Sequence, residues 1–219
     1  MRVISGTARG TKLNSIEEIT TRPTLDRVKE SLFNIVQNNI EDAVVLDLFS
    51  GSGSIGIEFL SRGCKKAYMC DISYKAISMI YQNLEKTKLQ KDAVVVNKDY
   101  KKCLLDFRNK NIVFDIVYID PPYRDDIAVN SVEMILSLKL LKNEGIIIVE
   151  TDELEREIKN LKKLDIQIYD CRKYGRAHLI FLKWKGLNNG NIYIIRRIRR
   201  HIRNCLLYTS PSPRDGLLS

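Results

Sequence analysis

The stretch FDIVYIDPPY, residues 114–123, joins an apolar segment to an acid, two prolines and an aromatic residue. Prolines fix φ and remove backbone donors, so the Asp120 carboxylate and the Pro121 carbonyl remain as acceptors. Such a pair suits an exocyclic amine, because it can bind both hydrogens while the nitrogen lone pair faces an electrophile. Tyr123 adds a ring on which a planar base can stack. We expect this corner to be catalytic, through Asp120, Pro121, Pro122 and Tyr123.

A second motif, LDLFSGSGSIG, carries Gly51, Gly53 and Gly56 in a GxGxxG spacing directly after an apolar segment. Glycines allow a tight turn there and let a ligand approach the backbone closely. The spacing alone fits a nicotinamide dinucleotide as well as other nucleosides. Asp47, four residues before the first glycine, favours a ligand with an ammonium group, because a carboxylate repels pyrophosphate. The motif therefore favours a nucleoside with an amino-acid end.

Acids also follow the next two apolar segments. Asp71 comes twenty residues after Gly51, where a carboxylate can accept hydrogen bonds from both hydroxyls of a ribose. Asp99 follows AVVVN and is placed either to bind an adenine amino group or to cap a helix. A nucleoside with an amino-acid end is S-adenosylmethionine, so we expect this cofactor. Its expected contacts are Asp47, Phe49, Gly51, Ser52, Gly53, Asp71, Ile72, Asp99 and Tyr100.

The elements that must position these residues alternate in type from about residue 43 to 150. Nearly continuous apolar runs predict strands buried on both faces, namely AVVLDLF, KAYMCD, AVVVNKD, IVFDIVYID and GIIIVE. The intervening stretches predict helices, namely IGIEFLSRG, YKAISMIYQNLEKTK, a short one after Asp99, and NSVEMILSLKLL. This alternation predicts right-handed βαβ units in an α/β fold with a doubly wound, Rossmann-like sheet. Together with the expected cofactor, we expect this to be a class I methyltransferase sheet.

Two further regions flank this alternation. LDIQIYDCRKYGRAHLIFLKW predicts an antiparallel C-terminal hairpin that turns at Gly175 and closes the sheet edge. MRVISGTARGTKL predicts a small N-terminal hairpin, and TTRPTLDRVKESLFNIVQNNI a helix after it. We expect an N-terminal extension over 1–42 and a methyltransferase domain over 43–185. Residues 186–219 are expected to be a basic tail that is disordered or not native, since YTSPSPRD resembles a translated sequencing-adapter fragment.

The composition limits the remaining possibilities. The chain has 219 residues, enough for one sizeable domain, and a formal net charge of +9. Residues 186–219 hold six Lys or Arg and one acid, so the rest is only mildly basic, which is compatible with RNA. Short apolar runs and the lack of a leader-like start predict no membrane span. Five cysteines without CxxC spacing and only two histidines predict a cytoplasmic protein without a metal site. We expect a monomer.

With DLFSGSGSIGIEFLSRG and DPPY placed, the chain resembles the bacterial RsmD-type enzymes. The resemblance extends to RVISGTARGTKL, TRPTLDRVKESLFNIV and KYGRAHLIFLK, and so covers residues 1 to about 185. Where many relatives have Glu-x-Asp after the second strand, this chain has CDIS, which leaves Asp71 as the ribose acid. The resemblance implies methylation of the N2 amine of a guanine in 16S ribosomal RNA. The implied partner is 16S rRNA or the assembling small ribosomal subunit.

The resemblance also implies that the N-terminal extension contacts RNA. Basic residues cluster in this part of the sequence and would neutralise phosphates, namely Arg2, Arg9, Lys12, Arg22, Arg27 and Lys29. Interspersed acids leave a solvated face as the alternative, and Arg22 is also placed to support the active-site loop. Three other functions stay open: an amino-methyltransferase acting on DNA adenine or a protein glutamine, a non-catalytic RNA-binding protein, and a nicotinamide dehydrogenase.

Overall fold

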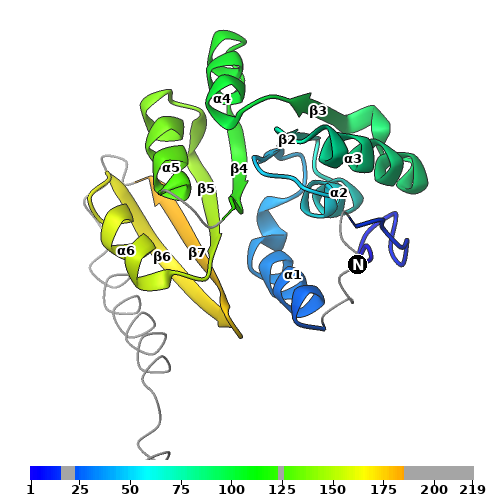
Figure 1. The fold of residues 1–219 in the computed structure, drawn as a ribbon, viewed down its shortest axis with the longest axis horizontal. Coiled ribbons are helices and arrows are strands. Elements are labelled where there is room, and N and C mark those ends of the chain that lie inside the picture. Colours follow the sequence, from blue (N-terminus) through cyan, green and yellow to red (C-terminus); the bar gives the residue numbers. More distant parts are fainter. Residues whose placement is uncertain (16–22, 123–125, 185–219) are drawn as a thin grey trace, which may run out of the picture.

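The computed structural model describes residues 1–15, 23–122 and 126–184. Its strands are β1 (Val44–Asp47), β2 (Lys66–Asp71), β3 (Ala93–Asn97), β4 (Phe114–Ile119), β5 (Leu141–Thr151), β6 (Ile166–Tyr174) and β7 (Ala177–Trp184). They form one sheet in the order β3-β2-β1-β4-β5-β7-β6 (Figure 1). Strands β1 to β5 pair in parallel, whereas β7 is antiparallel to both β5 and β6. The predicted doubly wound sheet with a C-terminal hairpin is confirmed.

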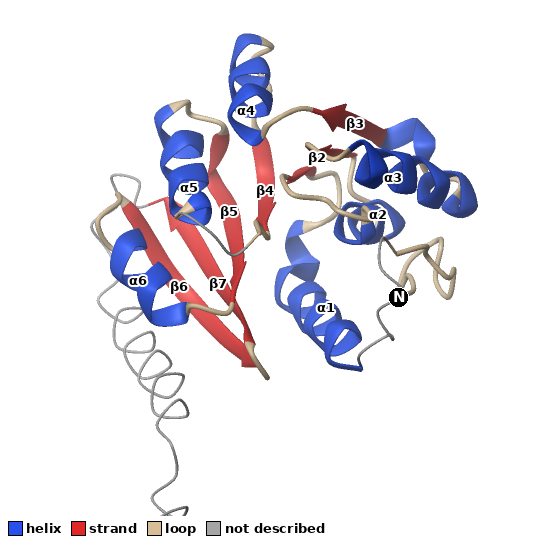
Figure 2. Ribbon diagram, viewed as in Figure 1, coloured by secondary structure: helices blue, strands red, loops and turns tan. Residues whose placement is uncertain are grey.

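Helices cover both faces of this sheet (Figure 2). They are α1 (Pro23–Val36), α2 (Ser54–Ser61), α3 (Tyr74–Thr87), α4 (Tyr100–Asn109), α5 (Ile127–Ser137) and α6 (Leu154–Leu161), with short 3-10 turns at Gln37–Asn39 and Gln90–Asp92. Helices α1 to α3 share a hydrophobic cluster on one face, and α4 to α6 share one on the other. Helix α6 was not predicted, although Leu154, Ile158 and Leu161 recur at helical spacing and are buried.

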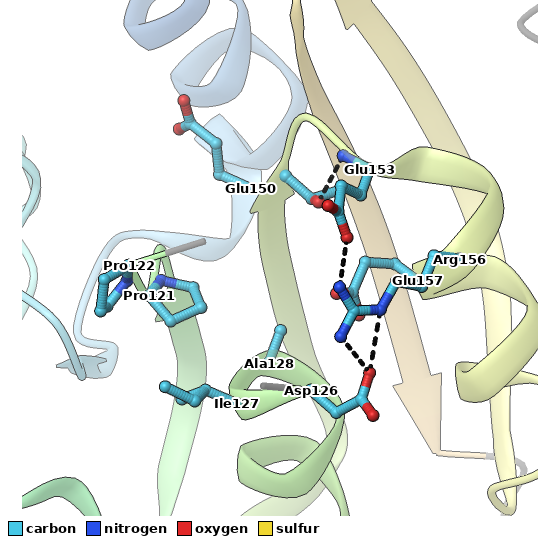
Figure 3. Close-up of a pocket in the computed structure, with 10 residues that line it drawn as sticks. Pro121, Pro122, Asp126, Ile127, Ala128, Glu150, Glu153, Arg156 and Glu157 are labelled. Carbon is cyan, nitrogen blue, oxygen red and sulfur yellow. Dashed lines mark hydrogen bonds and ion pairs between the residues drawn. The ribbon is translucent and has the colours of Figure 1, made fainter. Parts of the chain in front are cut away.

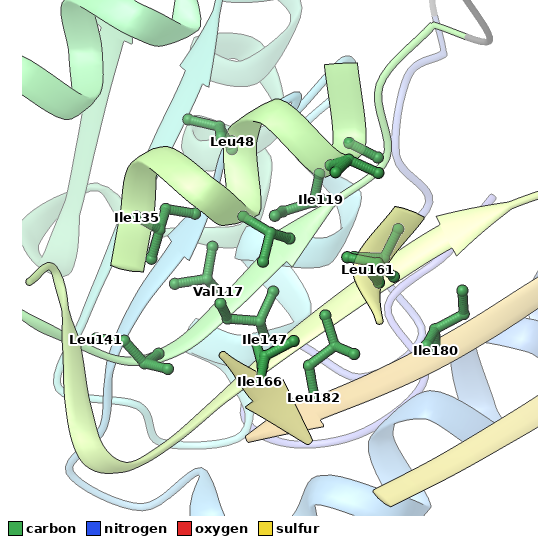
Figure 4. Packing of buried hydrophobic residues seen from close by; sticks show 14 of the residues in the cluster. Leu48, Val117, Ile119, Ile135, Leu141, Ile147, Leu161, Ile166, Ile180 and Leu182 are labelled. Carbon is green, nitrogen blue, oxygen red and sulfur yellow. The ribbon is translucent and has the colours of Figure 1, made fainter. Parts of the chain in front are cut away.

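The central strands are buried on both faces, which accounts for their continuous apolar pattern. Val117 of β4 and Ile147 of β5 pack in the cluster that contains Ile135 of α5 and Leu161 of α6 (Figure 4). The alternate residues of β4, such as Ile116, belong to the cluster on the opposite face. The strand ends at the carboxyl edge are therefore held by packing from two sides.

The N-terminal segment, residues 1–15, forms a small hairpin, as predicted, in which the Val3 amide donates to the Thr11 carbonyl at 3.0 Å and the Leu13 amide to the Met1 carbonyl at 3.1 Å. Arg2 and Lys12 form an isolated antiparallel bridge around a series of turns, and no strand is assigned within these fifteen described residues. Helix α2 also binds this segment through its side chains: the Ala8 amide donates to Ser61 Oγ at 2.9 Å. Gly6 has φ +83, and a Cβ there would lie 1.7 Å from the Ser61 carbonyl oxygen. The segment therefore lies directly against the end of α2 (Figure 1).

The N-terminal segment and α1 belong to the same hydrophobic cluster as β1 and α2. The domain boundary at residue 42 stays a prediction. Arg22, Tyr123 and the tail at 186–219 lie outside the described residues, so the predictions made for them are unchanged. Within the described ranges, none of the helices combines the length and apolar character needed to cross a bilayer.

Candidate active site at the carboxyl edge of the sheet

The strand order reverses between β1 and β4, which are direct neighbours. Asp47 at the end of β1 is in register with Tyr118 of β4, two residues before Asp120. The glycine loop and the proline corner therefore leave adjacent parallel strands at the same edge, which confirms that they lie side by side. In open α/β sheets, ligands bind in the crevice at such a switch point.

Asp47 is a buried acid at this switch point and is 1% exposed. Its Oδ2 accepts a hydrogen bond from the Gly56 amide at 3.1 Å. Burial raises the pKa of Asp47 to about 7; the Gly56 hydrogen bond limits this increase, and the charge of Asp71 adds to it. Burial disfavours the ionised form of a carboxylate, and a nearby cation stabilises that form. Asp47 is thus suited to hold a ligand's ammonium group.

The glycine loop is shaped by left-handed backbone conformations. Gly51 has φ +53 and Gly53 has φ +77, and Gly53 is the N-cap of α2. A Cβ at Gly51 would meet no atom within 4 Å, so the backbone there is open to a ligand. At Gly56 a Cβ would lie 2.5 Å from Met69, so this glycine allows α2 to pack closely on β2. The loop has the open backbone that a nucleoside-binding turn needs.

Asp71 forms the rim of the crevice at the end of β2. Its Oδ2 accepts from the Gly51 amide at 2.9 Å, and its Oδ1 accepts from the Ser73 amide at 2.8 Å. The Asn97 side chain donates to the carbonyls of Asp71 and Ile72, each at 3.0 Å. Each carboxylate oxygen keeps capacity for a further donor. Asp71 is therefore fixed in place and able to accept from ribose hydroxyls. Sequence reasoning missed the supporting Asn97.

Asp99 and its neighbours lie at the start of α4. Asp99 Oδ1 accepts from the Lys101 amide at 2.9 Å, so the helix-capping role is present in the structure. The rings of Phe49 and Tyr100 lie beside one another, with centroids 5.5 Å apart. This pair brings the glycine loop against the start of α4. An adenine contact by Asp99 stays a prediction.

The proline corner follows β4. Burial raises the pKa of Asp120 well above its usual value, and the charges of Glu150, Asp47 and Asp152 raise it further. Pro121 is buried and Pro122 is exposed. The corner adjoins a pocket between β5, α5 and α6 (Figure 3). The pocket is lined by Pro121, Pro122, Asp126, Ile127, Ala128, Glu150, Thr151, Glu153, Arg156 and Glu157.

Glu150, near the end of β5, is a site residue that sequence reasoning missed. The Tyr118 hydroxyl donates a hydrogen bond to Glu150 Oε2. A signal was present, because Glu150 follows the apolar run IIIV just as Asp47, Asp71 and Asp120 follow theirs. Among the described residues, no group of three His, Cys, Asp or Glu side chains is placed to hold a metal ion.

The basic residues expected to bind RNA fall into two kinds. Arg2, Arg9, Lys12 and Arg27 are exposed. Lys29 is 4% exposed, and its Nζ lies 2.9 Å from Glu58 Oε2. The prediction that Lys29 neutralises a phosphate is therefore wrong for this structure. Lys29 is spaced with the buried residues Phe33 and Val36 on one face of α1, so helical periodicity could have indicated its burial.

Comparisons with known proteins agree with this geometry. The family model described as conserved hypothetical protein 95 matches residues 1–183. A Bacillus subtilis protein, YlbH, provisionally named an rRNA methyltransferase, is 37% identical and aligns over 85% of this chain and 100% of its own length. Ribosomal RNA small subunit methyltransferase D of Haemophilus influenzae is 35% identical over 70% of this chain and 79% of that protein. The solved Escherichia coli structure of yhhF, provisionally named a methyltransferase, has a TM-score of 0.71 and 28% identity, covering 85% and 98% of the two chains.

Proposed function

We propose that this chain, which belongs to the family described as conserved hypothetical protein 95, methylates 16S ribosomal RNA at the N2 amine of a guanine. The match over residues 1–183 confirms the resemblance to the RsmD type. The observation that carries the proposal is the register of Asp47 with Tyr118, which brings the two loops to one crevice. Relatives named as rRNA methyltransferases support RNA as the substrate. Guanine N2 rests on the resemblance.

The cofactor is S-adenosylmethionine, and the polar groups of the crevice fit it. Asp47 would hold its ammonium group, Asp71 its ribose hydroxyls, and the open backbone at Gly51 would let it approach closely. Phe49, Ser52, Gly53, Ile72, Asp99 and Tyr100 are proposed to complete its contacts. When bound, it supplies a methyl group on a positively charged sulfur, which is a good leaving group.

The acceptor amine is held by the proline corner. Asp120 and the Pro121 carbonyl accept its two hydrogens, which leaves the nitrogen lone pair to face the methyl carbon. Alignment of the reacting atoms at about 3–3.5 Å lowers the barrier by making the transfer effectively unimolecular. The same acceptors bind more strongly as the nitrogen becomes cationic. The released proton passes to Asp120 or to water, and Tyr123 is proposed to stack on the base.

The N-terminal segment and α1 are proposed to bind the RNA backbone. Arg2, Arg9, Lys12 and Arg27 are exposed on these elements, and cationic side chains fix the register of a nucleic acid through its phosphates. Arg22 keeps its proposed role as an RNA contact or as support for the active-site loop. We also propose that the protein acts as a monomer in the cytoplasm.

The decisive experiment supplies methyl-labelled cofactor together with one of four acceptors: free 16S rRNA, small ribosomal subunits, DNA or a release factor. We expect label in the rRNA or the subunits, recovered as N2-methylguanosine in digested nucleosides. Label confined to DNA adenine or to a protein glutamine would overturn the substrate. Calorimetry with S-adenosylhomocysteine tests the cofactor independently, and a failure to bind it would favour a non-catalytic RNA-binding protein.

A further inference from the structure

Glu150 and Asp120 occupy equivalent positions on neighbouring strands. Ile119 of β4 is in register with Val149 of β5, and the two acids follow these residues directly. In parallel strands, paired positions present their side chains to the same face of the sheet. Tyr118 and Ile148 lie two residues before Asp120 and Glu150, on the same face of their strands, and belong to the cluster beneath α1 to α3. Both acids are therefore placed toward the face that carries Asp47.

The Glu150 carboxylate is anchored through one oxygen. The Tyr118 hydroxyl donates to Oε2, and Tyr118 is 3% exposed, so its hydroxyl has a fixed position. Among the described residues, Tyr118 is the hydrogen-bond donor to Glu150, and Oε1 is left for another donor. Glu150 is among the residues that line the pocket with Pro121 and Pro122, but its carboxylate points away from Asp126, Glu153 and Arg156 (Figure 3). The second oxygen is thus available on the face of the sheet that carries Asp47, where the charge of Glu150 acts on Asp120.

A purely structural role does not account for a charged residue at this position. A buried tyrosine hydroxyl needs one acceptor, and a neutral glutamine would supply it without a second carboxylate beside Asp120. Burial raises the pKa of Glu150, and the Tyr118 hydrogen bond limits the increase. Two neighbouring acids repel each other when both are ionised, and the repulsion is relieved when a ligand brings donors to both.

We propose that Glu150 determines base specificity by accepting the N1–H of the target guanine while Asp120 accepts from its N2 amine. This inference rests on the proposed function and assigns a second residue to the same site. Guanine presents these two donors side by side on its Watson–Crick edge. Adenine presents an N1 lone pair beside its amine. This lone pair would face the Glu150 carboxylate, and the two would repel each other. A site built to bind a donor rejects analogues that lack it.

The test uses an RNA fragment in which the target guanine, once located by mass spectrometry, is replaced by 2-aminopurine. This base keeps the exocyclic amine and carries a lone pair in place of N1–H. For the wild-type enzyme we expect kcat/KM to fall by roughly 30-fold or more, as for a lost hydrogen bond to a charged group. In Glu150→Gln, the amide can donate to that lone pair. We therefore expect the kcat/KM values for the guanine and 2-aminopurine substrates to lie within about 3-fold of each other.

Glu153→Gln is the matched control, because Glu153 lines the same pocket but forms an ion pair with Arg156. It should keep the wild-type ratio of kcat/KM for the guanine substrate to kcat/KM for the 2-aminopurine substrate. Tyr118→Phe gives a second measurement. It removes the hydrogen bond that holds Glu150 in place, so it should also lower this ratio. If the wild-type enzyme methylates no guanine in rRNA, the proposed function itself fails. If it does so and the ratio is unchanged in both Glu150→Gln and Tyr118→Phe, the role of Glu150 alone is overturned.

Discussion

Lys29 of α1 and Glu58 of α2 form an ion pair inside the protein, with 2.9 Å between Nζ and Oε2. The same carboxylate accepts from Arg62 Nε at 2.8 Å, and from the amides of Ile4 and Ser5 at 2.8 and 2.9 Å. One buried acid therefore joins the N-terminal segment to α1 and α2. This network holds the surface that we propose to bind RNA.

Replacing Lys29 should affect stability and leave the number of phosphate contacts unchanged. Lys29→Met removes a cation from a buried pair, and we expect a loss of about 3 kcal/mol in the free energy of unfolding. Arg9→Gln, on the exposed side of the segment, should leave stability within about 0.5 kcal/mol. It should also reduce the slope of log K for RNA against log salt by about 0.7 to 0.9. Urea denaturation measures the free energy of unfolding, and RNA binding at several salt concentrations measures the slope. A smaller salt slope in Lys29→Met at unchanged stability would contradict the buried pair.

Gly6 and Gly10 offer a matched pair of substitutions, because their φ values are +83 and +84. Alanine at either position carries the same left-handed strain, of order 1 kcal/mol. At Gly6, however, the new Cβ would lie 1.7 Å from the Ser61 carbonyl oxygen, whereas at Gly10 it would meet nothing within 4 Å. We expect Gly6→Ala to displace the N-terminal segment and weaken RNA binding, with cofactor affinity unchanged. Equal RNA affinities in the two variants would argue that the segment does not contact RNA.

Asp47→Asn should change how stability depends on pH. The pKa of Asp47 is raised from 3.8 to about 7 in the folded protein. Asp47 therefore makes its full contribution to the free energy of unfolding below pH ~3.8. This contribution is lost as pH rises through about 7, which lowers the free energy of unfolding by up to ~4 kcal/mol. Asparagine still accepts from Gly56 but does not ionise. The variant should be more stable than the wild type at about pH 8 and no more stable at about pH 4, by urea denaturation. Its affinity for S-adenosylmethionine should fall at least ~10-fold.

Asp120→Asn and Asp120→Ala separate positioning from proton transfer. The asparagine oxygen still accepts an amine hydrogen, so we expect this variant to keep part of the wild-type kcat. The alanine variant has no acceptor and should lose about 10²–10³-fold, the scale seen when one stabilising group is removed from an active site. Calorimetry should show nearly unchanged cofactor affinity in both. Equal inactivity of the two would make proton acceptance the main role of the carboxylate.

Asp99→Ser separates the two roles left open for Asp99. Serine remains a good N-cap, so the stability of the protein should stay close to the wild type, whereas Asp99→Ala should lose about 1 kcal/mol. If the carboxylate binds the adenine amino group, both variants weaken cofactor binding to a similar extent. Thermal unfolding and calorimetry measure the two effects. Wild-type affinity in Asp99→Ser would leave Asp99 with the capping role alone.

The acids at the strand ends were predictable because the pattern that locates them is local. Asp47, Asp71 and Asp120 each follow a continuous apolar run, and the carboxyl ends of parallel strands meet at one edge. Glu150 obeys the same rule, but no turn-forming motif follows it to draw attention to its side chain. Its importance depends on Tyr118 and Asp120, whose positions are known only from strand register.

The features that were missed depend on tertiary contacts. The N-terminal hairpin was predicted, but its attachment to α2, where Glu58 and Ser61 accept from its backbone amides, was not. Lys29 has the character of a surface residue, and its burial becomes favourable only because Glu58 lies opposite. Neither partner is near in sequence, so local propensity does not indicate these contacts.

The place of β7 between β5 and β6 constrains the order in which the chain can fold. The strand made last among the described elements is an interior one, so β5 has no partner on that side until residue 184 is synthesised. Until then β5 presents an unpaired apolar edge, the kind of surface that promotes aggregation and recruits chaperones. A nascent chain halted before β7 would therefore lack a finished sheet while still attached to a ribosome.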